Sequence, residues 1–181
     1  MNYVSQPRLR SLAFTALIGL TLALGSCRRV DWFVLKGSLR NKFGDEGWIT
    51  TQQLADWLDD RKRPAPLLLD VRTAAEWNVS HLPGARRVEP DATAKAAAGG
   101  VAKEAPIVTY CAVGYRSGKL AERLRAAGYT HVQNLEGSIF QWANEHRPLV
   151  HDGSPTHQVH PYSALRGQLL SDDVRAPLPP N

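Results

Sequence analysis

The sequence predicts an α/β domain with a mainly parallel β-sheet that is covered by helices on both faces. Short apolar runs at residues 67–71 and 106–110 have the length and composition of buried strands, and residues 131–135 are also expected to form a strand. Segments with apolar residues at helical spacing alternate with these runs. Because neighbouring parallel strands need crossover connections, this alternation indicates a parallel sheet.

The first helix is expected directly after Trp48, where the folded domain begins. Thr50 followed three residues later by Gln53 has the pattern of a capping box. Leu54 and Trp57 then lie at helical spacing on one face, and two prolines end the segment.

The remaining elements alternate to about residue 145. Asp91 is expected to cap an alanine-rich helix that stops at Gly99. The strand over 106–110 runs straight into Cys111, and Gly128 ends the helix that begins near Arg116. The full series comprises strands over 67–71, 85–88, 106–110 and 131–135, and helices over 73–79, 92–98, 116–127 and 138–145.

The composition is that of a globular chain. The 181 residues, of which 43% are hydrophobic and 22% charged, suffice for one domain with extensions at both ends. The formal charge is +5, but lysine and arginine are scattered among acidic residues, so no nucleic-acid partner is predicted. We expect an irregular tether over residues 27–47, a domain over 48–149, and an irregular, proline-rich C-terminal extension over 150–181.

Residues 1–26 have the pattern of a bacterial export signal. Arg8 and Arg10 precede an apolar run over residues 11–25, which is shorter than the roughly 20 residues of a membrane-spanning helix. The run ends in small residues before Cys27, which resembles the bacterial lipobox. The sequence therefore predicts lipidation at Cys27, a membrane partner, and a location in the bacterial cell envelope facing the periplasm or the exterior. Ordinary cleavage and an uncleaved signal anchor are the alternatives.

Cys111 is the one thiol that remains if Cys27 carries lipid. It lies where a strand ends and a loop containing Gly114 leads into a helix. Such a loop directs backbone N–H groups and the positive helix terminus toward an anion, here the thiolate. We therefore expect a lowered pKa for Cys111. Arg116 adds a permanent positive charge and a fork of donors for oxyanions.

The segment CAVGYRS, residues 111–117, resembles the active-site loop of the rhodanese or sulfurtransferase family. Residues 69–85 and 132–142 resemble two further signatures of that family, and the resemblance extends over residues 48–149. The sequence departs from the family pattern at Ser80, at Ser138 and at residues 146–147, where glycine is frequent.

The resemblance implies a doubly wound, mainly parallel sheet of about five strands flanked by helices. It implies that Cys111 takes sulfane sulfur from a donor such as thiosulfate, holds it as a persulfide and passes it to a thiophilic acceptor. The implied donor is a small sulfur-containing anion or a protein persulfide, and the acceptor is a thiol. No cofactor and no metal are implied. The implied substrate-binding residues are Ala112, Val113, Gly114, Tyr115, Arg116 and Ser117, with Asp70, Arg72 and Glu76 in support.

Several alternatives stay open at this point. Cysteine phosphatases also combine a cysteine, a loop and an arginine, but their loop is one residue longer. An envelope persulfide carrier, or a partner-binding module with little turnover, fits the same loop. The apolar side chains of the loop favour a larger or protein-borne donor over thiosulfate. His151, His157 and His160 lie close together, but without acidic or cysteine partners for a metal.

Overall fold

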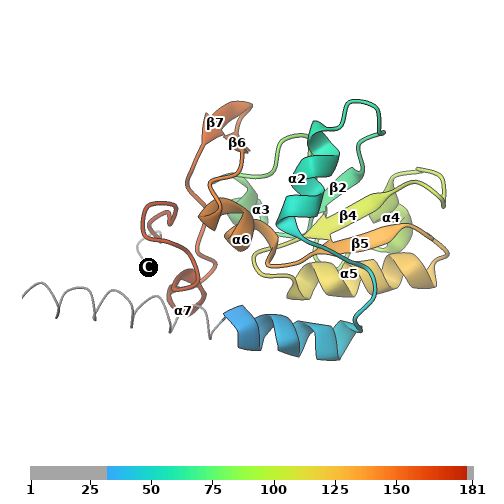
Figure 1. Cartoon of the computed structure of the whole chain (residues 1–181), viewed down its shortest axis with the longest axis horizontal. Coiled ribbons are helices and arrows are strands. Elements are labelled where there is room, and N and C mark those ends of the chain that lie inside the picture. The colour runs from blue at the N-terminus through green and yellow to red at the C-terminus, as the bar shows by residue number, and fades with distance from the viewer. Residues whose placement is uncertain (1–31, 179–181) are drawn as a thin grey trace, which may run out of the picture.

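The computed structural model, which describes residues 32–178, contains a five-stranded parallel sheet. The strand order is β1-β5-β4-β2-β3, and every neighbouring pair is parallel (Figure 1). This confirms the α/β prediction and the number of strands. The strands are β1 (Trp48–Ile49), β2 (Leu67–Asp70), β3 (Arg86–Arg87), β4 (Ile107–Tyr110) and β5 (Val132–Leu135).

Helices cover both faces of the sheet, and each face has its own hydrophobic core. Successive residues of a strand point to opposite faces. Leu68 and Val108 therefore enter the core beneath α2 and α6, whereas Leu69 and Ile107 enter the core beneath α4 and α5. The helices are α2 (Thr51–Asp59), α3 (Ala74–Trp77), α4 (Ala94–Ala98), α5 (Tyr115–Ala126) and α6 (Ser138–Asn144).

The strand order places a topological switch point between β2 and β4. The chain passes outward from β2 to β3, returns to β4, and then continues to β5 on the other side. Ligands of open parallel sheets bind outside the carboxyl ends of the strands at such a point. The loops after Asp70 and Tyr110 both emerge there, and the second one begins with Cys111.

Two predicted helix caps have different outcomes. The capping box of α2 is confirmed: the Thr50 hydroxyl accepts from the Gln53 N–H, and the Gln53 side chain accepts from the Thr50 N–H. The cap at Asp91 is wrong, because Thr93 is the N-cap of α4 and accepts from the Ala96 N–H. Both Asp91 and Thr93 are good capping residues, and the chain enters the helix at the later one.

The segment before the sheet is helical over residues 32–43, where we expected an irregular tether. Trp32, Leu35, Leu39 and Phe43 recur every three or four residues, which is the spacing of one helix face. Leu39 is buried, and Trp32 and Leu35 pack against the core beneath α2 and α6. We call this segment the N-terminal helix.

The C-terminal extension is largely ordered rather than irregular. It begins within the hairpin of β6 (Leu149–His151) and β7 (Ser154–Thr156) and includes the short helix α7 (Ala164–Gly167). Val159, Leu170 and Val174 are buried in the same core as α2 and α6. In Figure 1 the red α7 lies beside the start of the blue N-terminal helix, and side chains of both line one groove.

Within residues 32–178, no helix has both the length and the apolar composition that crossing a bilayer requires. The signal segment over residues 1–26 and the lipidation site Cys27 lie outside the described residues.

Candidate active site

Cys111 lies at the end of β4, where the chain turns into α5. Its side chain is buried, with 1% of the residue exposed. The Gly114 N–H points back at the thiol and donates to Sγ at 3.2 Å. The first N–H groups of α6 donate to the carbonyls of Cys111 and Ala112 at 3.2 and 3.1 Å. The loop is thus fixed from the α6 side while its own N–H group faces the sulfur.

Gly114 is required at the turn for two reasons. Its φ of 113° lies in the left-handed region that favours glycine. A Cβ atom there would also lie 3.3 Å from Leu39 Cδ1 of the N-terminal helix. The Asn134 side chain at the end of β5 donates to the Gly114 carbonyl at 2.9 Å, which holds the turn from below.

The surroundings of Cys111 favour its thiolate. Burial of the thiol opposes ionisation, but the positive charge of Arg116 and hydrogen bonds from Ser117 and Gly114 outweigh it, so the pKa is lowered. Within residues 32–178 the fully buried Ser117 hydroxyl has no hydrogen-bond partner apart from this interaction with Cys111. It is therefore available as a donor to sulfur held on Cys111.

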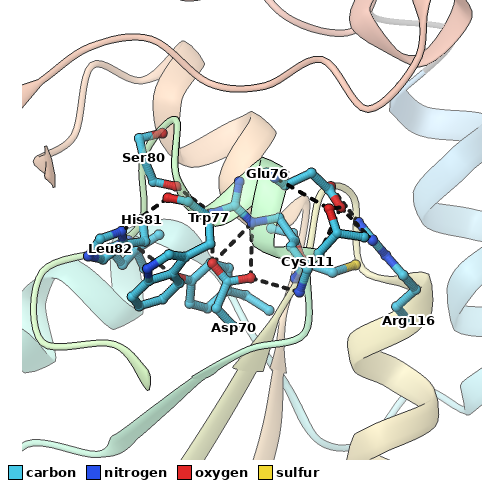
Figure 2. A network of polar contacts seen from close by, with 12 residues as sticks. Asp70, Glu76, Trp77, Ser80, His81, Leu82, Cys111 and Arg116 are labelled. Atoms are coloured by element: carbon cyan, nitrogen blue, oxygen red, sulfur yellow. Dashed lines mark hydrogen bonds and ion pairs between the residues drawn. The ribbon is translucent and has the colours of Figure 1, made fainter. Parts of the chain in front are cut away.

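Arg116 is bound to Glu76 of α3, the short helix that follows β2. Nη1 donates to Glu76 Oε2 and Nη2 to Oε1, each at 2.7 Å. Burial alone would raise the pKa of Glu76, but Arg116 and the capping contacts with Thr73 outweigh it, so this pKa is lowered. Figure 2 shows the carboxylate facing the guanidinium, with Cys111 beside the pair. The fork that we expected to hold an oxyanion is therefore occupied by Glu76.

Asp70 and Arg72 form a fully buried ion pair beneath the site. Arg72 Nη2 lies 2.7 Å from Asp70 Oδ2, and the same nitrogen donates to the Ser80 carbonyl. The Tyr110 hydroxyl accepts from the Leu82 N–H at 3.1 Å and fixes the same loop. These residues position the chain after β2, and neither Asp70 nor Arg72 lines the pocket above Cys111.

Ser138, at the start of α6, is a site residue that the sequence analysis noted only as a departure from glycine. Its φ of 50° explains why glycine is frequent at this position. Its hydroxyl accepts from the Cys111 N–H and donates to the Leu135 carbonyl, each at 3.2 Å. The serine therefore ties the backbone of Cys111 to the end of β5.

A pocket of about 130 Å³ lies above the thiol. It brings together five of the seven predicted loop residues, while Gly114 and Ser117 lie beneath it. Two lining residues come from the C-terminal extension and were not predicted. The Tyr162 ring centre lies 5.0 Å from the Arg116 guanidinium carbon, and Arg166 lies beside it. The lining consists of Cys111, Ala112, Val113, Tyr115, Arg116, Tyr162 and Arg166.

The C-terminal histidines do not form a metal-binding group. Across residues 32–178, three or more histidine, cysteine or acidic side chains nowhere gather in an arrangement that could hold a metal ion. His160 instead accepts the Tyr162 N–H on Nδ1 at 3.0 Å, and His151 lies beside Asp152.

Comparison with known proteins agrees with this geometry. The family model described as a rhodanese-like domain matches residues 50–145. The chain belongs to the rhodanese-like domain family. Tyr162 and Arg166 lie beyond the matched residues, so this rhodanese-like protein completes its pocket from outside the family domain.

The relatives of this rhodanese-like protein include proteins named as sulfurtransferases. It is 32% identical over 102 residues to the probable adenylyltransferase/sulfurtransferase MoeZ of Mycobacterium tuberculosis, a match that covers 55% of this chain and 25% of the relative. It is 29% identical over 180 residues to the tRNA uridine(34) hydroxylase of Cronobacter sakazakii, covering 88% of this chain and 50% of that protein. The chain thus spans a quarter to a half of these relatives.

The fold of the rhodanese-like domain has solved counterparts. The solution structure of the rhodanese-like domain of the Anabaena protein Alr3790 superposes with a TM-score of 0.53 at 26% identity. The match covers 60% of this chain and 81% of that domain.

Proposed function

We propose that this rhodanese-like protein is a sulfurtransferase that moves sulfane sulfur from a donor such as thiosulfate to a thiophilic acceptor through a persulfide on Cys111. The observation that carries the proposal is a thiol of lowered pKa at the floor of a small pocket, with a backbone N–H 3.2 Å from its sulfur. A thiolate is the form of cysteine that attacks sulfur.

The proposed cycle has two steps. The Cys111 thiolate attacks the sulfane sulfur of thiosulfate, an S–S bond forms, and the S–S bond of the donor breaks as sulfite leaves with the electron pair. An acceptor such as cyanide or a thiolate then attacks the outer sulfur of the persulfide, and Cys111 leaves as a thiolate. Charge balances in both steps without an oxidant or a reductant.

The chain contributes charge and fixed donors to this cycle. Arg116 stabilises the negative sulfur at both stages, because Glu76 holds its guanidinium in place beside Cys111. The Gly114 N–H and the Ser117 hydroxyl lie near the anion before the reaction starts, and such preorganised donors need no rearrangement in the transition state.

A thiosulfate:cyanide sulfurtransferase assay of the wild type beside Cys111→Ser tests the proposal, with the intact mass recorded after thiosulfate treatment. We expect thiocyanate formation and a mass gain of one sulfur atom in the wild type alone. A mass gain without turnover would instead identify a persulfide carrier that delivers sulfur to a specific acceptor. Neither signal would favour a partner-binding module.

We also propose that the chain is anchored to the bacterial envelope by lipid on Cys27 and acts there on the outer side of the membrane. The positive residues, the apolar run and the small residues before Cys27 support this proposal. Fractionation of cells that express the wild type or Cys27→Ala tests it. Lipidation predicts a membrane-bound wild type with the mass of a lipidated N-terminal cysteine, and equal fractionation of both proteins would contradict it.

A further inference from the structure

Arg166 is a second arginine at the pocket, and no other side chain among residues 32–178 pairs with its guanidinium. It lines the pocket above Cys111, yet within residues 32–178 its side chain makes no hydrogen bond or ion pair. Arg116, by contrast, uses both terminal nitrogens on Glu76. Of the two guanidinium groups at the pocket, Arg166 is therefore the one that can offer its fork to a bound anion.

The backbone that carries Arg166 is held firmly. The Ser163 hydroxyl caps α7 by accepting from the Arg166 N–H, and Arg175 Nε donates to the Gly167 carbonyl at 2.8 Å. Leu169 and Leu170, which follow α7 after one residue, are buried. The free guanidinium therefore extends from a fixed backbone beside the pocket, and only its side chain has to order when an anion binds.

The pocket dimensions limit the ligand. Cys111 is 1% exposed at the floor, and a volume of about 130 Å³ admits one small molecule. Tyr162 narrows the opening, because its ring lies over Arg116. A donor that presents sulfur to Sγ must place its other end toward the mouth, where Tyr162 and Arg166 lie. A pocket of this size favours a small donor, whereas the apolar side chains of the loop favour a larger one.

We infer that Arg166 and Tyr162 of the C-terminal extension select the sulfur donor. Arg166, beside Tyr162, binds the oxyanion end of a small sulfane-sulfur donor. The inference rests on the proposed sulfurtransferase function. A thiosulfate or a short thiosulfonate has the required form, with a sulfane sulfur at one end and an oxyanion at the other. A persulfide of equal size without an oxyanion lacks the group that Arg166 recognises.

The test compares two donors on the 181-residue chain: thiosulfate and 2-hydroxyethyl persulfide. The proteins are the wild type, Arg166→Gln, Arg166→Lys, and Arg61→Gln, which removes the same charge from an exposed site in the loop after α2. We expect Arg166→Gln to lower the ratio of kcat/KM for thiosulfate over the persulfide by about tenfold or more, mainly through KM. Arg166→Lys should keep part of the selectivity, since it retains the charge but not the fork. Arg61→Gln should match the wild type.

Two outcomes overturn the inference. One is an unchanged donor ratio in Arg166→Gln. The other is an equal loss with both donors, which would show that Arg166 has only a general structural role. If the wild type transfers sulfur from neither donor, the proposed function fails, and thiosulfate binding to Cys111→Ser by calorimetry then decides the inference separately. Weaker binding when Arg166→Gln is added supports the oxyanion contact, and equal binding refutes it.

Discussion

At the scale of single residues, the chemistry of the site depends on how charge is distributed around Cys111. Arg116 lies between an acid that fixes it and a thiol that it helps to ionise. Glu76 therefore acts on the sulfur through Arg116. A positive group whose position is fixed stabilises the thiolate better than a mobile one, because no reorganisation is needed when the charge forms.

The lowered pKa of Cys111 predicts a shifted pH profile. The rate of alkylation by iodoacetamide should rise with pH and level off below the range of a free cysteine, whose pKa is about 8.5. The thiolate is the reactive form, so the midpoint reports its pKa. Alkylation of the wild type across pH 5–10 measures it, with Cys111→Ser as the blank. A midpoint at or above that of free cysteine would contradict the account.

Glu76→Gln should lower the free energy of unfolding by about 2 kcal/mol at neutral pH, because it leaves a half-buried Arg116 without its partner. The pKa of Glu76 is lowered in the folded state, so its contribution is complete above the unfolded value of about 4.3 and is lost as pH falls through the lower folded value. The difference in free energy of unfolding between the wild type and Glu76→Gln should therefore shrink below about pH 4.

Urea denaturation at several pH values measures this difference. Glu89→Gln is the matched control, since Glu89 also pairs with an arginine but at the surface. A similar loss of stability in both variants, or a Glu76→Gln effect that persists at low pH, would be inconsistent with a stabilising Glu76–Arg116 pair.

At the scale of elements, the N-terminal helix supports the active-site loop from outside the family domain. Leu39 approaches Gly114, and Phe43 packs on Gly118 of α5, where a Cβ atom would lie 2.7 Å from Phe43 Cε2. The Phe43 and Tyr115 rings also meet edge to face with centroids 5.8 Å apart. The helix therefore contacts the first turn of α5, directly after the cysteine loop.

Gly118→Ala tests this contact, because its effect on the free energy of unfolding should have opposite signs with and without the Phe43 ring. In the wild type the new methyl group should displace Phe43 and lower the free energy of unfolding. In a Phe43→Ala background the same change should raise it by about 0.5–1 kcal/mol, the gain of alanine over glycine inside a helix. Gly37→Ala in the N-terminal helix is the control, because no atom lies within 4 Å of its new Cβ. The same sign in both backgrounds would show that Phe43 does not pack there.

At the scale of the whole molecule, the folded unit is larger than the family domain. Residues on both sides of the matched range contribute to the core, and residues after it also line the pocket. Tyr162 and Arg166 of the C-terminal extension line the pocket without altering the cysteine loop. They can therefore change which donors reach Cys111. In this protein, donor preference is therefore proposed to depend on residues outside the matched range.

Leu170→Ala should destabilise the whole domain by about 2–4 kcal/mol, as expected for a fully buried leucine. The transition should stay single, because the extension shares its core with α2 and α6. Chemical denaturation monitored by tryptophan fluorescence and by circular dichroism provides the measurement. Leu165→Ala, at a leucine that is 73% exposed, should have little effect. Two separate transitions would mean that the extension unfolds on its own.

The sequence predicts the central part of this fold well and the pocket in part. Strands β2 and β4 are short, mostly apolar runs, and the cysteine loop has a local pattern, so both can be recognised from neighbouring residues. The N-terminal helix was missed although its apolar spacing is helical. Tyr162 and Arg166 had no local signal, because they reach the pocket only through tertiary packing of a segment with irregular spacing. The role of Ser138 needs a backbone angle that the sequence does not specify.

The most direct test of the central claim is the intact mass of the protein after treatment with thiosulfate and removal of excess donor. A persulfide on Cys111 predicts a gain of one sulfur atom on the wild type, loss of that gain when cyanide is added, and no gain on Cys111→Ser. A wild type that keeps its original mass, or a gain that persists in Cys111→Ser, would contradict a persulfide on Cys111.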